Sequence, residues 1–168
     1  MKLLREILYK VEINSVVGNT SLSINKIEFD SRLISDGDMY IAITGVNVDG
    51  HSFISQAIQN GANCIVCEKT PENKTDGVVY VNVKSSRKAL AIISSNYFDN
   101  PSSKLNLIGV TGTNGKTTIA TLLFDLYTEL EIKSGLISTV KISYDNKNFQ
   151  ANQTTPDSLS INRFLSEM

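Results

Sequence analysis

The sequence contains no tryptophan, three prolines, two cysteines and a single histidine, His51. With one histidine and one cysteine pair, the chain cannot assemble a four-ligand zinc site by itself. Cys64 and Cys67 lie in the segment 63–67, which has the composition of a short strand, and side chains three apart on a strand point to opposite faces. We therefore expect two structural cysteines and not a redox or zinc pair.

Long apolar runs and runs of one charge are also missing. No stretch approaches the roughly 18 consecutive apolar residues of a membrane-spanning helix, and the first residues do not form a signal-peptide core. Sixteen basic and seventeen acidic residues give a formal net charge of -1, without the lysine or arginine clusters that bind nucleic acid or anionic membranes. We expect a cytoplasmic protein that binds neither nucleic acid nor membrane.

Hydrophobic residues make up 41% of the 168 positions, enough for one ordinary domain or two small ones. Helical spacing of apolar residues predicts helices over 2–9, 52–60, a segment capped by Ser85, and 116–130. Apolar and β-branched stretches bounded by turn residues predict strands over 24–29, 39–43, 64–67, 78–83, 105–110 and 135–140. The polar segment 70–77 is expected to be a loop.

These elements predict an α/β protein with two parts. A small mixed α/β domain is expected over residues 1–103, and residues 104–168 are expected to begin a parallel-sheet ATPase domain with a phosphate loop. In that second part, the strand 105–110, the helix 116–130 and the strand 135–140 should form one right-handed β–α–β unit with parallel pairing. A hairpin is expected to turn at Asp145–Asn146, and Thr155 should cap a last helix with Pro156 at its first position.

The strongest chemical signal is the segment 110–118, Val-Thr-Gly-Thr-Asn-Gly-Lys-Thr-Thr, between a predicted buried strand and a predicted helix. Its glycines let successive backbone N–H groups converge on phosphate oxygens, and the helix N-terminus adds its positive dipole end. Lys116 would reach the β- and γ-phosphates of ATP, while the Thr117 hydroxyl would bind Mg²⁺. The ATP-binding residues are expected to be Gly112, Thr113, Asn114, Gly115, Lys116, Thr117 and Thr118.

Two features weigh on this interpretation. The common phosphate-loop pattern has a glycine where this chain has Val110. A chance Gly-Lys-Thr in a loop is the simpler alternative, but the strand–loop–helix setting that a phosphate loop requires is predicted here, and it favours the phosphate loop.

The form Thr-Gly-Thr-Asn-Gly-Lys-Thr-Thr resembles the loop of the Mur ligases and of their folylpolyglutamate synthetase relatives. Asp30-Ser31-Arg32 and the segments 37–42, 49–54 and 57–62 together resemble the amino-terminal domain of the Mur ligases that add the third residue of the muropeptide. Thr154-Thr155-Pro156 resembles a threonine pair of the same ligases. The likeness covers nearly the whole chain.

This resemblance implies an ATP- and Mg²⁺-dependent ligase of peptidoglycan synthesis. Its substrates would be UDP-N-acetylmuramoyl-L-alanyl-D-glutamate and an amino acid, often meso-diaminopimelate, joined through an acyl phosphate. By matching position, Ser31 would contact the uridine end, Thr154 and Thr155 would contact the muramoyl part, and Lys116 would be the catalytic lysine of the ATP loop. The full-length ligase is expected to be a monomer.

Simpler interpretations remain for several of these residues. Asp30-Ser31-Arg32 alone could be a turn after a strand in which the side chains bond nearby backbone. His51 could contact a ligand, but a place in the loop before a helix is favoured. Thr155-Pro156 is also an ordinary helix start.

The function also has alternatives. The chain could come from a sister ligase, either D-alanyl-D-alanine-adding or folylpolyglutamate-forming, or it could be a non-catalytic module that binds nucleotide sugars. After Thr117 no apolar strand ends in the aspartate or glutamate that would supply a second metal ligand. The resemblance also implies three features further along the chain: a middle-domain lysine that becomes carbamylated, a catalytic histidine, and a carboxy-terminal domain that selects the amino acid. None of them is found in the 168 residues. We therefore expect the 168 residues by themselves to be inactive.

Overall fold

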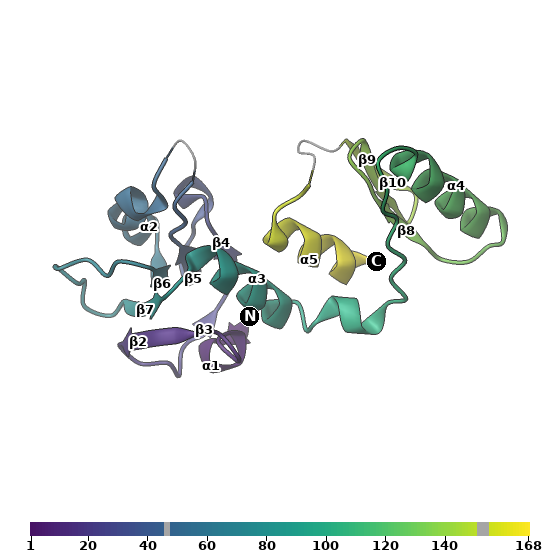
Figure 1. The fold of residues 1–168 in the computed structure, drawn as a ribbon. Helices are drawn as coiled ribbons and strands as arrows, with labels where there is room; N and C mark the ends of the chain where they lie inside the picture. Colours follow the sequence, from purple (N-terminus) through teal and green to yellow (C-terminus); the bar gives the residue numbers. More distant parts are fainter. Residues whose placement is uncertain (46–47, 151–154) are drawn as a thin grey trace. The chain divides into compact units, whose positions relative to one another are not determined.

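The computed structural model describes residues 1–45, 48–150 and 155–168. The chain divides into two compact units, Met1–Asp99 and Asn100–Met168, which are described separately (Figure 1). None of the helices in these ranges is long and apolar enough to cross a membrane.

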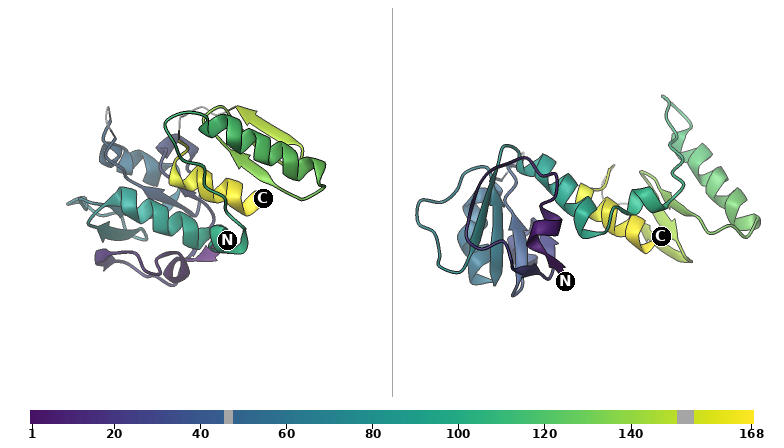
Figure 2. Two further views of the ribbon diagram at one scale, coloured as in Figure 1. Left: turned by 45° about the vertical axis from the view of Figure 1, so that its right-hand side comes forward. Right: turned by 90° about the horizontal axis from the view of Figure 1, so that it is seen from below.

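The first unit contains a five-stranded sheet (Figures 1 and 2). In spatial order its strands are β2 (Ile13–Val17), β7 (Val79–Val83), β6 (Ala62–Cys67), β5 (Asp38–Ile41) and β4 (Ile27–Glu28). The last four strands pair in parallel, and β2 adds to β7 as an antiparallel edge strand. A separate antiparallel pair joins β1 (Lys2–Leu3) to β3 (Ser23–Ile24). The expected α/β class is confirmed, and its parallel sheet lies in this first unit, whereas the parallel sheet was expected in the second.

The first unit also contains short helices, and the strand side chains alternate between the two faces of its sheet. The helices are α1 (Leu4–Ile7), η1 (Ser31–Leu33), η2 (Gly50–Phe53), α2 (Ile54–Gln59) and α3 (Ser86–Tyr97). Tyr40, Ile65 and Tyr80 share one core cluster with Ile54 and Ala57 of α2. Their strand neighbours Met39, Val66 and Val81 are equally buried and point to the opposite face of the sheet.

Several expected elements of the first unit are confirmed. The strands β5, β6 and β7 lie within a residue or two of their predicted ranges. Ser85 caps α3, because its side chain accepts a hydrogen bond from the Lys88 N–H. Cys67 belongs to the core cluster beside α2, whereas Cys64 is buried outside that cluster, as expected for residues three apart on a strand.

Other expectations for this unit were wrong in detail. The predicted helix 2–9 is the short strand β1 followed by four helical residues, and the first part of the predicted helix 52–60 is the 3₁₀ turn η2. The predicted strand 24–29 is broken into β3 and β4, since these strands pair with different partners, β1 and β5. The edge strand β2 was not predicted, because Asn14 and Ser15 interrupt its apolar pattern.

The second unit is built from two longer helices and a small sheet. Its elements are η3 (Pro101–Lys104), α4 (Lys116–Glu129), β8 (Gly135–Ile137), β9 (Lys141–Tyr144), β10 (Lys147–Gln150) and α5 (Ser158–Glu167). The predicted hairpin is confirmed: β9 and β10 pair antiparallel around Asp145 and Asn146, which both have positive φ as a type I′ turn requires. The range of α4 agrees with its prediction to within a residue.

The predicted parallel β–α–β unit in this part is wrong. Residues 105–110 form no strand, and Leu107 and Ile108 are exposed. The strand β8 ends at Ile137, and it pairs antiparallel with β9. The apolar pattern of 105–110 is that of a strand covered on both faces, but a strand also needs a hydrogen-bonding neighbour, and none of the described strands pairs with this segment.

The last helix also begins differently from its prediction. Asp157, not Thr155, caps α5, and its side chain accepts hydrogen bonds from the N–H and hydroxyl of Ser160. The helix packs on the hairpin through an aromatic cluster, in which the ring of Phe164 lies 6.2 Å from Tyr144 and 5.9 Å from Phe149 between centroids. Pro156 consequently precedes the cap and is not the first helical residue.

Candidate functional site

The predicted ATP loop leads directly into a helix, as a phosphate loop requires. Residues 112–115 are solvent-exposed, and α4 begins at Lys116. Gly115 occupies the N-cap position with φ of +77°, a left-handed conformation that glycine adopts without steric cost. No side chain of the described residues caps this helix. Its first N–H groups are therefore available to an anion, which the positive end of the helix dipole would also stabilise.

Lys116 folds back over this loop. Its Nζ donates to the carbonyl oxygen of Gly112 at 2.6 Å and to that of Thr113 at 3.2 Å. The ammonium group thus lies beside the same backbone turn whose N–H groups would hold phosphate. A phosphate group bound in the turn would compete with these two carbonyls for the charge of Lys116.

Thr117, the expected Mg²⁺ ligand, is half-buried at the first turn of α4. Its Oγ1 lies 3.4 Å from Oγ1 of Thr139, in the turn between β8 and β9. A hydroxyl oxygen is a ligand type that Mg²⁺ accepts, and this ion usually takes only one or two protein ligands together with phosphate oxygens. Among the residues described, no group of three or more His, Cys, Asp or Glu could hold a metal ion. Thr117 therefore fits as one member of a site completed by nucleotide.

The remaining predicted residues of the second unit have different surroundings. Asn114 and Thr118 are exposed, one in the loop and one in the first turn of α4. Thr155 is exposed in a bend two residues before the cap of α5, and Thr154 lies outside the described residues.

Ser31, the predicted uridine contact, lies at the carboxyl end of β4 and opens the turn η1. It is only 5% exposed, and its Oγ donates to Oε1 of Gln56 at 3.0 Å. The carbonyl oxygen of Ser31 accepts from Nδ2 of Asn60 at 2.8 Å. Ser31 is thus held by the side chain of Gln56 in α2 and by that of Asn60, the C-cap of the same helix.

The neighbours of Ser31 form a closed ion pair. Asp30 accepts from the Arg32 N–H and from its guanidinium, Nε to Oδ1 at 2.9 Å and Nη2 to Oδ2 at 2.7 Å. The guanidinium of Arg32 lowers the pKa of Asp30, chiefly through these side-chain bonds. The simpler interpretation, a turn after a strand, therefore describes Asp30 correctly, but Ser31 bonds to a helix far along the chain.

His51 ties the loop after β5 to the end of β6. Its Nε2 accepts from the Glu68 N–H at 2.9 Å, so the ring proton is on Nδ1, which lies 2.7 Å from Oδ1 of Asp49. The backbone N–H of His51 also donates to Asp49, and this bond is the main reason that the pKa of Asp49 is lowered. His51 lies within the 3₁₀ turn η2 that leads into α2, and not in a loop before a helix as expected, and its ring is a structural cross-link.

Four of the residues described above follow the carboxyl ends of the parallel strands of the first unit. Ser31 follows β4, His51 follows β5, Glu68 follows β6 and Ser85 follows β7. In open parallel sheets, ligands bind outside the carboxyl ends of the strands.

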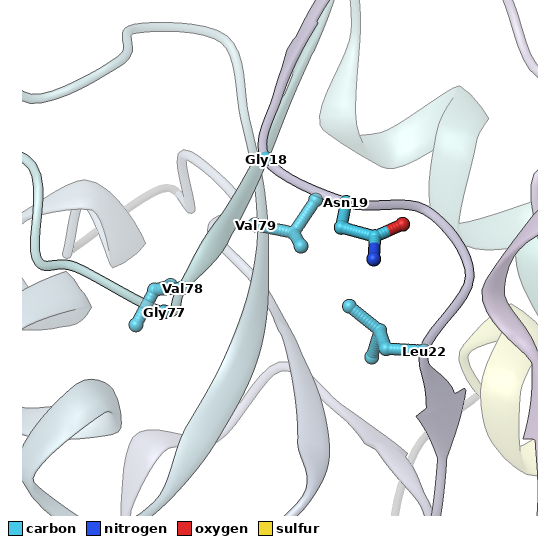
Figure 3. A pocket seen from close by; sticks show the side chains of 6 residues that line it. All are labelled: Gly18, Asn19, Leu22, Gly77, Val78 and Val79. Atoms are coloured by element: carbon cyan, nitrogen blue, oxygen red, sulfur yellow. The ribbon is translucent and has the colours of Figure 1, made fainter.

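A cavity of about 320 Å³ lies elsewhere in the first unit (Figure 3). It is lined at the start of β7 and after β2 by Gly18, Asn19, Leu22, Gly77, Val78 and Val79. None of these residues is ionisable, and none was predicted as a site residue.

The sequence did not identify Gln56 and Asn60 as neighbours of Ser31. One signal was present: the two residues are four apart, so they lie on the same side of a helix and beside its apolar face. The partner of that polar side could not be assigned, because Ser31 is 25 residues earlier in the chain.

Comparison with protein families gives two matches along the chain. The model of the Mur ligase family catalytic domain matches residues 23–98, and the model of the Mur ligase middle domain matches residues 110–168. The predicted phosphate loop begins the second match, and Ser31 with its partners falls inside the first.

Individual relatives are similar over nearly all of the chain. UDP-N-acetylmuramoyl-L-alanyl-D-glutamate--2,6-diaminopimelate ligase of Cytophaga hutchinsonii is 49% identical over 166 residues, which cover 98% of this chain and 34% of the relative. A solved structure of a UDP-N-acetylmuramoyl-L-alanyl-D-glutamate--2,6-diaminopimelate ligase matches 99% of this chain and 33% of its own with a TM-score of 0.74 at 22% identity, a likeness of fold. MurF ligase of Thermotoga maritima in complex with ADP matches 82% of this chain and 28% of its own, with a TM-score of 0.54 and 29% identity. The chain therefore spans about a third of the length of the curated relatives it matches.

Proposed function

Because this chain belongs to the Mur ligase family, we propose that it supplies the nucleotide-sugar site and the ATP phosphate loop of a ligase of peptidoglycan synthesis. The proposed reaction joins an amino acid to UDP-N-acetylmuramoyl-L-alanyl-D-glutamate, and we propose meso-diaminopimelate as that amino acid. Support comes from the relative of C. hutchinsonii, whose name states this reaction, and from the motifs around Ser31 and Lys116. Residues 1–103 would form the substrate-binding domain, and residues 104–168 would open the ATP-binding domain.

The chemistry proposed for the full-length ligase has two steps. The γ-phosphoryl group of ATP moves to an oxygen of the glutamyl carboxylate, so the bond between the β- and γ-phosphates breaks and ADP leaves. The amine of the incoming amino acid then attacks the acyl carbon, phosphate leaves, and the nitrogen loses a proton as the amide forms. Both steps depend on positioning and charge neutralisation more than on covalent chemistry by the protein.

The loop 112–118 would hold the phosphates. The uncapped N–H groups at the start of α4 would bind phosphate oxygens, and Lys116 would exchange its two carbonyl partners for the β- and γ-phosphates. Mg²⁺, held by Thr117 and the nucleotide, would neutralise further phosphate charge. This uncapped helix start with a lysine folded over it is the observation that carries the proposal.

Ser31 and Thr155, with Thr154 beside it in the sequence, would belong to the nucleotide-sugar site in this proposal. The full-length ligase should bind UDP-N-acetylmuramoyl-dipeptide more tightly than UDP-glucose in calorimetry. If the Ser31→Ala and Thr155→Ala variants of that ligase keep the wild-type affinity, the assignment of these residues is wrong.

Substitution of the loop lysine tests the ATP site. In the full-length ligase, Lys116→Ala should reduce amide formation roughly 100-fold or more, because charge stabilisation is lost where phosphate transfers. Lys133→Ala is the matched control, since Lys133 is also exposed and follows the same helix. Equal activities of the two variants would refute the role of Lys116.

The 168-residue chain gives a second test. It should bind ATP weakly, with Lys116→Ala and not Lys133→Ala reducing that binding, and it should release no phosphate from ATP. Robust phosphate release that Lys116→Ala abolishes would show that the catalytic groups are already complete in this chain, contrary to the expectation.

A further inference from the structure

The hydroxyl of Ser31 is already engaged within the protein. A serine hydroxyl has one hydrogen to donate, and in this structure that hydrogen goes to Oε1 of Gln56. Ser31 is also 5% exposed, so little of its surface can reach a bound molecule. A direct donor role for Ser31 toward the nucleotide sugar would require breaking this bond.

Gln56, in contrast, is exposed on α2. Its Oε1 is fixed by Ser31, which orients the whole planar carboxamide, and the two N–H groups of Nε2 have no hydrogen-bond acceptor within the described part of the chain. Asn60, one turn later, is fastened to the Ser31 carbonyl oxygen and keeps α2 against η1. The arrangement presents an oriented amide donor at the carboxyl end of β4.

The surroundings of this donor are neutral. Asp30 and Arg32 satisfy each other through two side-chain bonds, so the turn offers no unpaired cation for a phosphate. Phe53, three residues before Gln56 at the N-cap of α2, is 38% exposed and provides an apolar surface at the start of that helix. Amide N–H groups beside an exposed aromatic ring suit a flat heterocycle that carries carbonyl oxygens.

We propose that Gln56 donates from Nε2 to a carbonyl oxygen of the uracil base of the nucleotide sugar, and that Ser31 is the positioning residue that orients Gln56. The inference rests on the proposed function, since it takes the nucleotide sugar as the ligand. It assigns to Gln56 the contact that the sequence resemblance gave to Ser31.

A double-mutant cycle on the 168-residue chain separates the two roles. Calorimetry with UDP should show that Gln56→Ala weakens binding about tenfold. This change corresponds to about 1.4 kcal/mol of binding free energy, the contribution expected of a single hydrogen bond. Ser31→Ala should also weaken binding in the wild-type background, but less than about twofold when Gln56 is already alanine, because its effect passes through that side chain. Ser31→Thr, which keeps the hydroxyl, should restore binding.

Gln59→Ala is the matched control, since Gln59 is an exposed glutamine on the same helix. It should leave UDP binding unchanged, and circular dichroism melting of every variant identifies those that weaken binding only by unfolding. Independent and additive effects of Ser31→Ala and Gln56→Ala would overturn the inference, because Ser31 would then contact the ligand itself.

Side-chain amide resonances of Gln56 provide a direct readout. In ¹⁵N-correlated NMR spectra, they should shift on addition of UDP, and inorganic pyrophosphate should leave them in place. A shift with pyrophosphate would overturn the assignment to the base. If the wild-type chain binds neither UDP nor UDP-N-acetylmuramoyl-dipeptide, the proposed function itself fails, and this inference falls with it.

Discussion

Replacing His51 with alanine should destabilise the first unit substantially. The ring makes two hydrogen bonds, one that accepts from the Glu68 N–H at 2.9 Å and one to Asp49 at 2.7 Å, and its side chain is only 12% exposed. Each bond contributes about 1 kcal/mol, so their loss should lower the free energy of unfolding by about 2 kcal/mol. Because Glu68 is exposed, water can replace the lost acceptor, and a larger penalty for an unsatisfied N–H is not expected.

The magnitude is readily measured. For a unit of about 100 residues, 1 kcal/mol corresponds to a melting-temperature change of roughly 4–8 °C, so His51→Ala should lower Tm by about 8–16 °C. The sequence has no tryptophan, so urea unfolding is best followed by circular dichroism. The matched control is Ser52→Ala, at the next and exposed position of the same turn.

The outcome distinguishes a cross-link from an ordinary loop residue. If His51→Ala and Ser52→Ala have the same unfolding free energy within about 0.5 kcal/mol, the ring does not anchor the loop, and the reasoning from its two bonds is refuted. His51→Gln is informative as well, because a glutamine oxygen can accept from the Glu68 N–H and should recover part of the loss.

Two further predictions concern the same unit. Tyr40→Phe removes the bond from the Tyr40 hydroxyl to the Gly50 carbonyl oxygen at 2.9 Å and should cost about 1 kcal/mol in urea unfolding at neutral pH. Burial raises the pKa of Tyr40 to about 12, against about 10 in the unfolded chain. The stabilisation that the neutral Tyr40 side chain contributes is therefore complete below pH 10 and lost as pH rises toward 12. The stability of the Tyr40→Phe variant should fall less at alkaline pH than that of the wild type, and an equal fall would contradict this. Gly61→Ala should cost about 1–3 kcal/mol, because Gly61 has φ of +108° and a Cβ there would lie 2.7 Å from the Asp36 backbone. Gly77→Ala, with φ of +82° and open space around its Cβ, measures the backbone strain alone and should cost clearly less.

Local signals were sufficient for much of the fold. Ser85 stands before a helical apolar pattern and caps α3, and Asp145–Asn146 supplies the two positive-φ residues that a tight hairpin needs. Such features depend on neighbours within a few positions, so the sequence displays them directly. The edge strand β2 depends instead on β7, more than sixty residues later, and its interrupted pattern gave no local indication.

The predicted phosphate loop and the turn at Ser31 also differ in whether their surroundings are local in sequence. The loop is continuous in sequence, so its glycines, Lys116 and the helix start could all be predicted together. The surroundings of Ser31 come from α2, and neither its burial nor its bond to Gln56 follows from the motif. The apolar pattern of residues 105–110 predicts a buried strand, but strand formation also depends on a pairing partner, which the pattern does not specify.

The two free cysteines give this molecule an intrinsic probe of partial opening. Both lie on the central strand β6, they are the only cysteines of the chain, and burial raises the pKa of the Cys64 thiol, so the reactive thiolate is scarce while the sheet is intact. Because both side chains are buried on the faces of the sheet, a thiol reagent such as a disulfide dye can react with them only after the residues packed over β6 move away. The rate of labelling under native conditions therefore reports the opening of the first unit and is insensitive to local opening of the second, which has no thiol. The opening of the first unit can thus be followed separately from that of the second in one intact chain.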